Sequence, residues 1–174
     1  AELINLDDIS KDISILDGIQ NIMPYGVSEN LQVQRSNLVD AYKRSELVPS
    51  VGLGVFALSS IIVDKAEPSE ALKANVAWHR GMPNPTYLLS SLQVDQFRHG
   101  GEVNLEVDVK AEKGAFLVQS SFNLSNKQAK SWMIGADVNK DQSAIASLIQ
   151  VLTSNDAIED QIKNEIEQGT ERLK

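Results

Sequence analysis

The chain has 174 residues, 42% of them hydrophobic and 23% charged, which is typical of one ordinary globular domain. It contains no cysteine, so disulfides, thiol catalysis and thiolate metal sites are excluded. The formal net charge is −8 and no basic stripe is present, so nucleic acid is not an expected partner.

The first part of the chain is predicted to be helical. Apolar residues recur at spacings of three and four through residues 7–23, which predicts an amphipathic helix that ends before Pro24. These apolar residues are Ile9, Ile13, Leu16, Ile19 and Ile22. A second helix is expected from Ser28 to about Glu46, with Pro49 beyond its end.

The next stretch is harder to assign. Residues 51–63 form the longest apolar run, and 13 residues are too few for a transmembrane helix, which needs about 20. The run fits a buried strand or a buried helix, and its glycines and its β-branched end favour the strand. A short helix is then expected from Pro68 to Trp78, followed by a loop over residues 80–85.

Residues 87–138 contain four strand-like runs separated by turn residues, which predicts an antiparallel meander. Alternation is complete over residues 102–110, where valines and a leucine face one way and polar residues the other. By this pattern Glu106 and Asp108 lie on the solvent face.

After residue 141 the apolar period becomes helical, which predicts C-terminal helices over residues 142–173, either two helices or one kinked helix. These helices are expected to cover the apolar face of the meander. The predicted fold is therefore α+β in one domain over residues 1–174. Its parts are a helical segment at 1–48, a sheet-containing core at 51–138 and the C-terminal helices.

No motif predicts catalysis, a metal or a cofactor. The triplet Asp137, Asn139 and Asp141 begins like a calcium loop, but the glycine and the glutamate that should follow are missing, so a helix cap is the preferred interpretation. The two histidines, His79 and His99, have no partner at a spacing typical of a triad or a ligand pair.

Both ends of the chain are acidic and carry isoleucine stripes. Residues 1–30 hold six acids and one base, and residues 155–174 hold six acids and three bases. Each stripe either packs within the domain or binds a partner. If they bind a partner, the predicted partner-binding residues are Ile9, Ile13, Leu16, Ile158, Ile162 and Ile166.

The order of features from about residue 87 to 166 resembles a bacterial family. The residues that carry the resemblance are 92–97 before a glycine turn, 103–107, 122–124, the strand around Trp132 and a closing helix from Ser143. This pattern is similar to that of the ABC-type transport auxiliary lipoproteins, envelope proteins that accompany lipid-transport systems of the MCE type. The family implies no catalytic residues. It does imply a lipidated N-terminal cysteine, which this sequence lacks, and the first 60 residues do not follow its usual opening.

The leading hypothesis is a non-enzymatic component of a bacterial envelope transport or secretion assembly, periplasmic or envelope-associated, that acts through protein–protein contacts or as a homo-oligomer. One alternative is a carrier that holds a lipid or another apolar small molecule in a helix-closed cavity, and a second is a structural or viral assembly protein. A cytoplasmic location is the alternative to the envelope.

Overall fold

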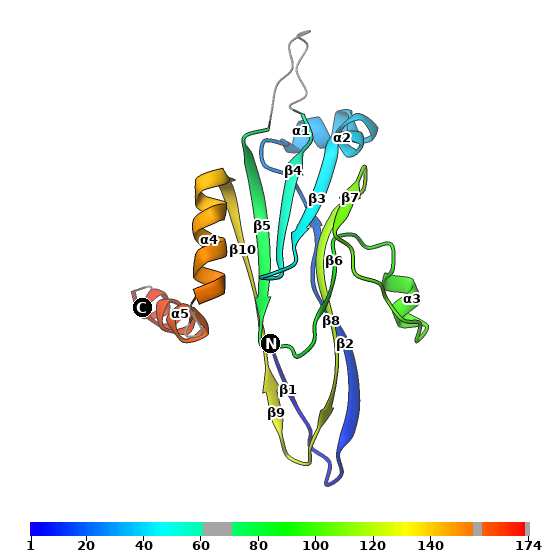
Figure 1. The fold of residues 1–174 in the computed structure, drawn as a ribbon, viewed down its shortest axis with the longest axis vertical. Coiled ribbons are helices and arrows are strands. Elements are labelled where there is room, and N and C mark those ends of the chain that lie inside the picture. Colours follow the sequence, from blue (N-terminus) through cyan, green and yellow to red (C-terminus); the bar gives the residue numbers. More distant parts are fainter. Residues whose placement is uncertain (61–70, 155–157, 173–174) are drawn as a thin grey trace.

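The computed structural model describes residues 1–60, 71–154 and 158–172. Within these residues the chain is α+β, with five helices and ten strands in three antiparallel sheets (Figure 1). The largest sheet has the order β10-β5-β4-β3-β7. In that order its strands are Met133–Asp141, Lys73–Arg80, Leu53–Leu58, Lys43–Val48 and Asp108–Lys110.

The second sheet has the order β2-β8-β6, with strands Lys11–Ile22, Gly114–Leu124 and Thr86–Leu88. The third pairs β1 (Glu2–Ile4) with β9 (Ala129–Ser131). This small sheet lies at one end of the elongated molecule, opposite α1 (Glu29–Gln34) and α2 (Ser36–Tyr42) (Figure 1).

The main core lies between the two larger sheets. Alternate residues of each strand face opposite sides of a sheet, so each large sheet contributes one face to this core. Its buried residues include Leu47, Phe56 and Ala77 from the five-stranded sheet, and Phe116 and Val118 from β8.

The other face of the five-stranded sheet is covered by the C-terminal helices α4 (Gln142–Ser154) and α5 (Ile158–Arg172). Leu53 and Val76 of the sheet share a buried cluster with Leu152 and Ile158 of the two helices. The outer face of the three-stranded sheet carries α3 (Val94–Arg98), whose Val94 packs on the cluster around Leu117.

The helix predicted for residues 7–23 is wrong, because this segment contains the 12-residue strand β2. Ile13, Ile15 and Ile19 lie opposite core-facing positions of β8, so the isoleucines also satisfy a period of two. β-Branched residues favour strands, and Gly18 in the middle of a helix would cost about 1 kcal/mol. The segment 1–48 is therefore only partly helical.

The helix predicted for residues 28–46 is two short helices that end at Tyr42, after which β3 begins. Ser28 does cap the first, because its Oγ accepts a hydrogen bond from Leu31 N. The strand favoured within 51–63 is confirmed as β4, although residues 61–63 lie outside the described residues. The helix predicted for 68–78 is wrong over residues 73–78, which belong to β5, and residues 68–70 are not described.

The four-stranded meander at 87–138 is also wrong. Its segments are divided among all three sheets: β8 pairs with β2 and β6, β10 pairs with β5, and β9 pairs with β1. Residues 102–110 form a strand only at Asp108–Lys110, and the rest is irregular. The alternation in this segment was therefore not a sign of regular pairing.

The C-terminal helices are confirmed as two, α4 and α5, although the sheet they cover is the five-stranded one. Asp141 caps α4 through a hydrogen bond of 2.8 Å from Ala144 N to Asp141 Oδ1. No helix of the described residues combines the length and the apolar composition needed to cross a lipid bilayer.

Candidate functional site

The predicted N-terminal partner stripe is divided by the strand. On β2, Ile13 lies opposite Phe122 and faces the main core, whereas Leu16 points to the other side and packs on the cluster of Leu88 and Leu117. Both side chains are half-buried. Ile9 precedes the strand and is 65% exposed. The three residues therefore form no common surface.

The C-terminal stripe is divided in a similar way. Ile158 is buried against the five-stranded sheet, and Ile162 packs partly on the same cluster. Ile166, about two turns beyond Ile158 on α5, is 62% exposed. Of the six predicted partner-binding residues, Ile9 and Ile166 are therefore the ones whose side chains are mainly free to contact a partner.

Ile9 is one of three exposed apolar residues near one end of the molecule. The loop that joins β1 to β2 exposes Leu6 (78%) as well as Ile9, and Ile4 at the end of β1 is 50% exposed. We call Ile4, Leu6 and Ile9 the apolar tip. Large side chains exposed this far, in one short segment, are a feature of interaction surfaces rather than of a core.

The backbone of the apolar tip is held by the side chain of Asn5, which is only 7% exposed. Asn5 Nδ2 lies 2.8 Å from the carbonyl oxygen of Ile9 and 3.0 Å from those of Leu124 and Ser125. Asn5 Oδ1 accepts a hydrogen bond of 3.0 Å from Asp7 N, and this closes a turn at the start of the loop. One side chain thus ties the loop to the turn that follows β8.

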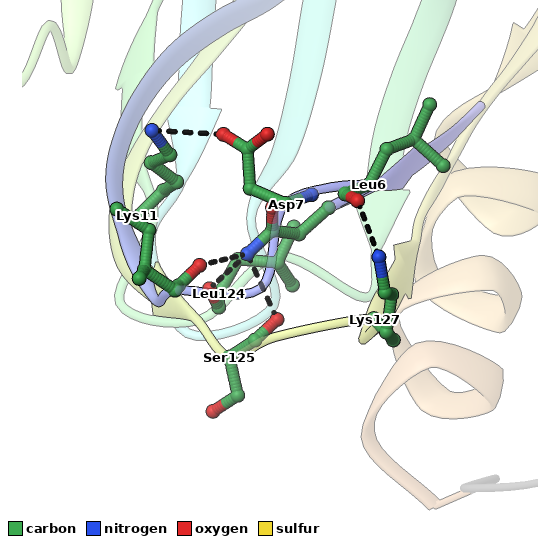
Figure 2. Close-up of polar contacts among 8 residues, drawn as sticks. Leu6, Asp7, Lys11, Leu124, Ser125 and Lys127 are labelled. Atoms are coloured by element: carbon green, nitrogen blue, oxygen red, sulfur yellow. Dashed lines mark hydrogen bonds and ion pairs between the residues drawn. The ribbon is translucent and has the colours of Figure 1, made fainter.

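The charges around the apolar tip are paired. Lys11 Nζ lies 2.9 Å from Asp7 Oδ2, and Lys127 Nζ lies 3.1 Å from Asp8 Oδ1. Lys127 Nζ also donates a hydrogen bond of 2.6 Å to the Leu6 carbonyl, and Figure 2 shows both lysines reaching across to the loop. A tip with matched charges and exposed apolar side chains suits an apolar partner surface better than a strongly charged one.

The sequence pattern indicated Ile9 but not Leu6 or Asn5. The available signal was Asn5 itself, since an asparagine side chain accepts a hydrogen bond from the backbone N–H two residues further on in an Asx turn. The helical interpretation of residues 7–23 concealed this signal, because it assigned Asp7 to a helix and not to a turn.

The two histidines have different surroundings. His79 is buried in β5, where its Nδ1 lies 3.1 Å from the hydroxyl of Tyr87, and burial lowers the pKa of its ring below the usual value. The sequence predicted that His79 follows the end of a helix, and this was wrong because the segment is β5. His99 is exposed after α3, with Nδ1 2.6 Å from the Asp95 carbonyl oxygen. The ring of His79 is therefore a core group and is not placed to meet a substrate.

Glu106 was predicted to face solvent, but its carboxylate is bonded within the protein. Its Oε2 accepts hydrogen bonds of 2.7 Å from Leu89 N and 2.8 Å from Ser90 N. Its Oε1 accepts hydrogen bonds of 3.0 Å from Ser90 Oγ and 2.8 Å from Gln93 Nε2. The carboxylate thus replaces a strand partner for the backbone after β6, which is a structural role. Asp108 is exposed and pairs with Arg44 at 3.0 Å.

A polar cleft of about 620 Å³ lies between α3 and the outer face of the three-stranded sheet. Its lining residues are Ser14, Phe97, Arg98, Gly100, Gly101, Glu102, Val103, Gln119 and Ser121. Among these, one carboxylate and no histidine are present, so the cleft itself supplies no pair of groups for acid–base chemistry.

The described residues contain no group of three His, Asp or Glu side chains close enough to hold a metal ion. The oxygens of the calcium-like triplet are used by protein donors. Asp137 pairs with Lys140 at 2.5 Å, Asn139 accepts from Lys73 Nζ at 2.7 Å, and Asp141 caps α4. This triplet lies within β10 and is a structural element.

No protein-family model matches this sequence, and no curated protein is significantly similar to it. The resemblance to the auxiliary lipoproteins therefore depends on the residues quoted above, and the apolar tip is the feature from which a function can be argued.

Proposed function

We propose that this protein is a non-enzymatic component of a bacterial envelope transport or secretion assembly, periplasmic or envelope-associated, and that it acts by binding another protein of that assembly through the apolar tip. The observation that carries the proposal is the combination of exposure and rigidity. Leu6 is 78% exposed while the loop around it is fixed by the buried Asn5 side chain. A rigid apolar anchor loses little conformational entropy on binding, which is how anchors in interfaces gain affinity.

The partner in this proposal presents an apolar pocket with a polar rim. Leu6 and Ile9 would enter the pocket, and the Asp8–Lys127 pair would lie at the rim. Such exposed pairs contribute little affinity themselves, but they select a partner whose rim is complementary. Ile166 on α5 is the exposed residue of a second candidate contact.

The packing of the C-terminal helices favours this proposal over a lipid carrier. A carrier needs an apolar space between a sheet and its covering helices. Here Leu152 and Ile158 share a buried cluster with Leu53 and Val76 of the sheet, so apolar side chains fill the contact.

The experiment is site-specific photo-crosslinking in cells that produce the native assembly. A photoreactive amino acid replaces Leu6 in one strain. In the control strain it replaces Leu105, an apolar residue that is 50% exposed away from the apolar tip. We expect one discrete protein adduct at Leu6, recovered from the envelope fraction, and no such adduct at Leu105.

The adduct should also disappear when Ile9→Asp is added, because a carboxylate inside an apolar pocket is costly to desolvate. Loss of the adduct with unchanged circular dichroism and melting temperature supports binding through the apolar tip. The absence of any protein adduct at Leu6, or an adduct that persists unchanged in the Ile9→Asp variant, would refute the proposal.

A further inference from the structure

The strand β2 has one long unpaired edge. Within the described part of the chain β8 is its sole strand partner, and the pairing is continuous from Lys11 to Gln20 before a register shift near Ile22. In Figure 1 the first half of β2 lies at the margin of the molecule, with β8 on its inner side. An unpaired edge of this length exposes a row of backbone N–H and C=O groups.

The other sheet edges are protected by familiar means. β7, β6, β1 and β9 are three residues long each, and β6 is also bonded on its far side, where Glu106 N donates to the Tyr87 carbonyl. β10 carries a register shift between Asp137 and Lys140, two residues that also form an ion pair. Short strands, bulges and charges prevent unwanted pairing, and residues 12–16 of β2 contain none of these except Asp12.

From this edge we propose that β2 pairs with β2 of a second copy of this chain, antiparallel about a twofold axis at Ser14, so that two three-stranded sheets become one six-stranded sheet. This inference goes beyond the proposed function and involves a different surface from the apolar tip.

The strand sequence selects the register. In an antiparallel ladder, a residue whose backbone N–H and C=O point to the partner strand lies opposite a residue of the same kind. Such residues alternate along β2, so two residues paired across the shared edge differ by an even number of positions. The twofold axis must therefore pass through a residue. An axis at Ser14 puts Lys11 opposite Asp17 and Ile13 opposite Ile15, and on the other face Asp12 opposite Leu16.

An axis at Ile13 would instead put Lys11 opposite Ile15, and one at Ile15 would put Asp17 opposite Ile13. Of these three axes, only the one at Ser14 places opposite charges across from each other and also places isoleucine across from isoleucine. Cross-strand pairs of this kind are the unit that stabilises a sheet.

The side chains involved are available. Ser14 is exposed, and Ile13 and Ile15 are half-buried, so a second copy would cover their remaining surface. Lys11 now pairs with the exposed Asp7, an interaction that a flexible lysine can exchange for Asp17. Asp17 Oδ2 accepts a hydrogen bond of 2.6 Å from Trp132 Nε1, which fixes its position near the edge.

The first test uses single cysteines, which the cysteine-free chain makes unambiguous. Ser14→Cys places two thiols face to face at the axis, with Cβ atoms about 4.5–5.5 Å apart, so that a small shift brings them to the separation of about 3.5–4.5 Å found in a disulfide. Ser121→Cys is the matched control, because Ser121 is the register partner of Ser14 on β8. In the proposed dimer, β8 and its symmetry mate are three strand spacings apart, about 14 Å, which is too far for a disulfide.

We expect mild oxidation to convert Ser14→Cys, and not Ser121→Cys, to a covalent dimer of twice 19.1 kDa. We also expect the unmodified protein to sediment as a dimer at sub-millimolar concentration. Ser14→Lys should raise the dimer dissociation constant by roughly tenfold or more, because it sets like charges opposite each other, while Ser121→Lys should leave it unchanged.

A monomeric unmodified protein would overturn the inference, as would equal crosslinking of the two cysteine variants. A strand from a different protein would then be the remaining occupant of the edge. Neither result bears on the photo-crosslink at Leu6, so the two proposals fail or stand separately.

Discussion

Replacing Asn5 by alanine tests whether one side chain holds the apolar tip. The change removes two N–H donors that serve three carbonyl oxygens, of Ile9, Leu124 and Ser125. The bond to Leu124 is buried, and its loss costs about 1–3 kcal/mol. The other two oxygens are partly accessible to water, and each lost bond there costs about 0.5–1 kcal/mol.

We therefore expect Asn5→Ala to lower the free energy of unfolding by about 2–5 kcal/mol, measured by urea denaturation. Amide hydrogen exchange should also speed up at Asp7, whose N–H loses its acceptor on Asn5. Asn126→Ala is the control. Its Nδ2 makes one exposed hydrogen bond of 3.2 Å to the Asp8 carbonyl, so its loss should cost less than about 0.5 kcal/mol. Equal losses for the two variants, or unchanged exchange at Asp7, would refute the role given to Asn5.

Three further predictions concern the body of the protein. Glu106→Gln should destabilise it by about 1–3 kcal/mol in urea denaturation, because an amide offers one acceptor oxygen where four donors now converge, and a loss within error would contradict this. Burial lowers the pKa of His79 in the folded state below 6.5, so only the unfolded chain takes up a proton as the pH falls below that value. The stability present above about pH 6.5 should therefore decline on acidification. The fall in melting temperature from pH 7.5 to 5.5 should be smaller in His79→Gln than in the unmodified protein, and an equal fall in the two would contradict this. Gly18→Ala should cost several kcal/mol, since a Cβ there would lie 2.0 Å from the Phe116 carbonyl oxygen, whereas Gly169→Ala, in the open on α5, should stabilise by about 0.5–1 kcal/mol. Thermal melts that rank the two glycine variants the other way would contradict the packing at Gly18.

The helices α4 and α5 and the strand β8 were predicted correctly because one period fits each of them best. In α4 and α5 the apolar residues follow only the helical period, and in β8 the residues Phe116, Val118 and Phe122 follow only the period of two. Residues 7–23 fit both periods, because Ile13, Ile15 and Ile19 alternate while Ile9, Ile13 and Leu16 are spaced as in a helix. Spacing alone could not decide between them, and pairing with β8, which is distant in sequence, did.

Local sequence patterns could not predict the strand order of the sheets either, because that order also depends on pairing between distant segments. β8 and β10 are separated by only a few residues, yet they belong to different sheets, because β9 leaves to pair with β1 at the start of the chain. Such long-range pairing depends on segments more than 100 residues apart. No feature of residues 87–138 taken by themselves contained this information.

The candidate site was also predictable from the sequence only in part. Exposure of Ile9 and Ile166 was consistent with the isoleucine stripes, but what distinguishes the apolar tip is its support by Asn5. Asn5 and Glu106 have equivalent roles in two irregular segments. Each is a polar side chain that satisfies backbone groups which regular pairing leaves unpaired, the carbonyls after β8 in one case and the amides after β6 in the other. A buried polar group is stable only when it is bonded, so the identity of these two residues fixes the path of the chain around them. Asn5 can therefore determine how Leu6 and Ile9 are presented although it is itself too buried to touch a partner.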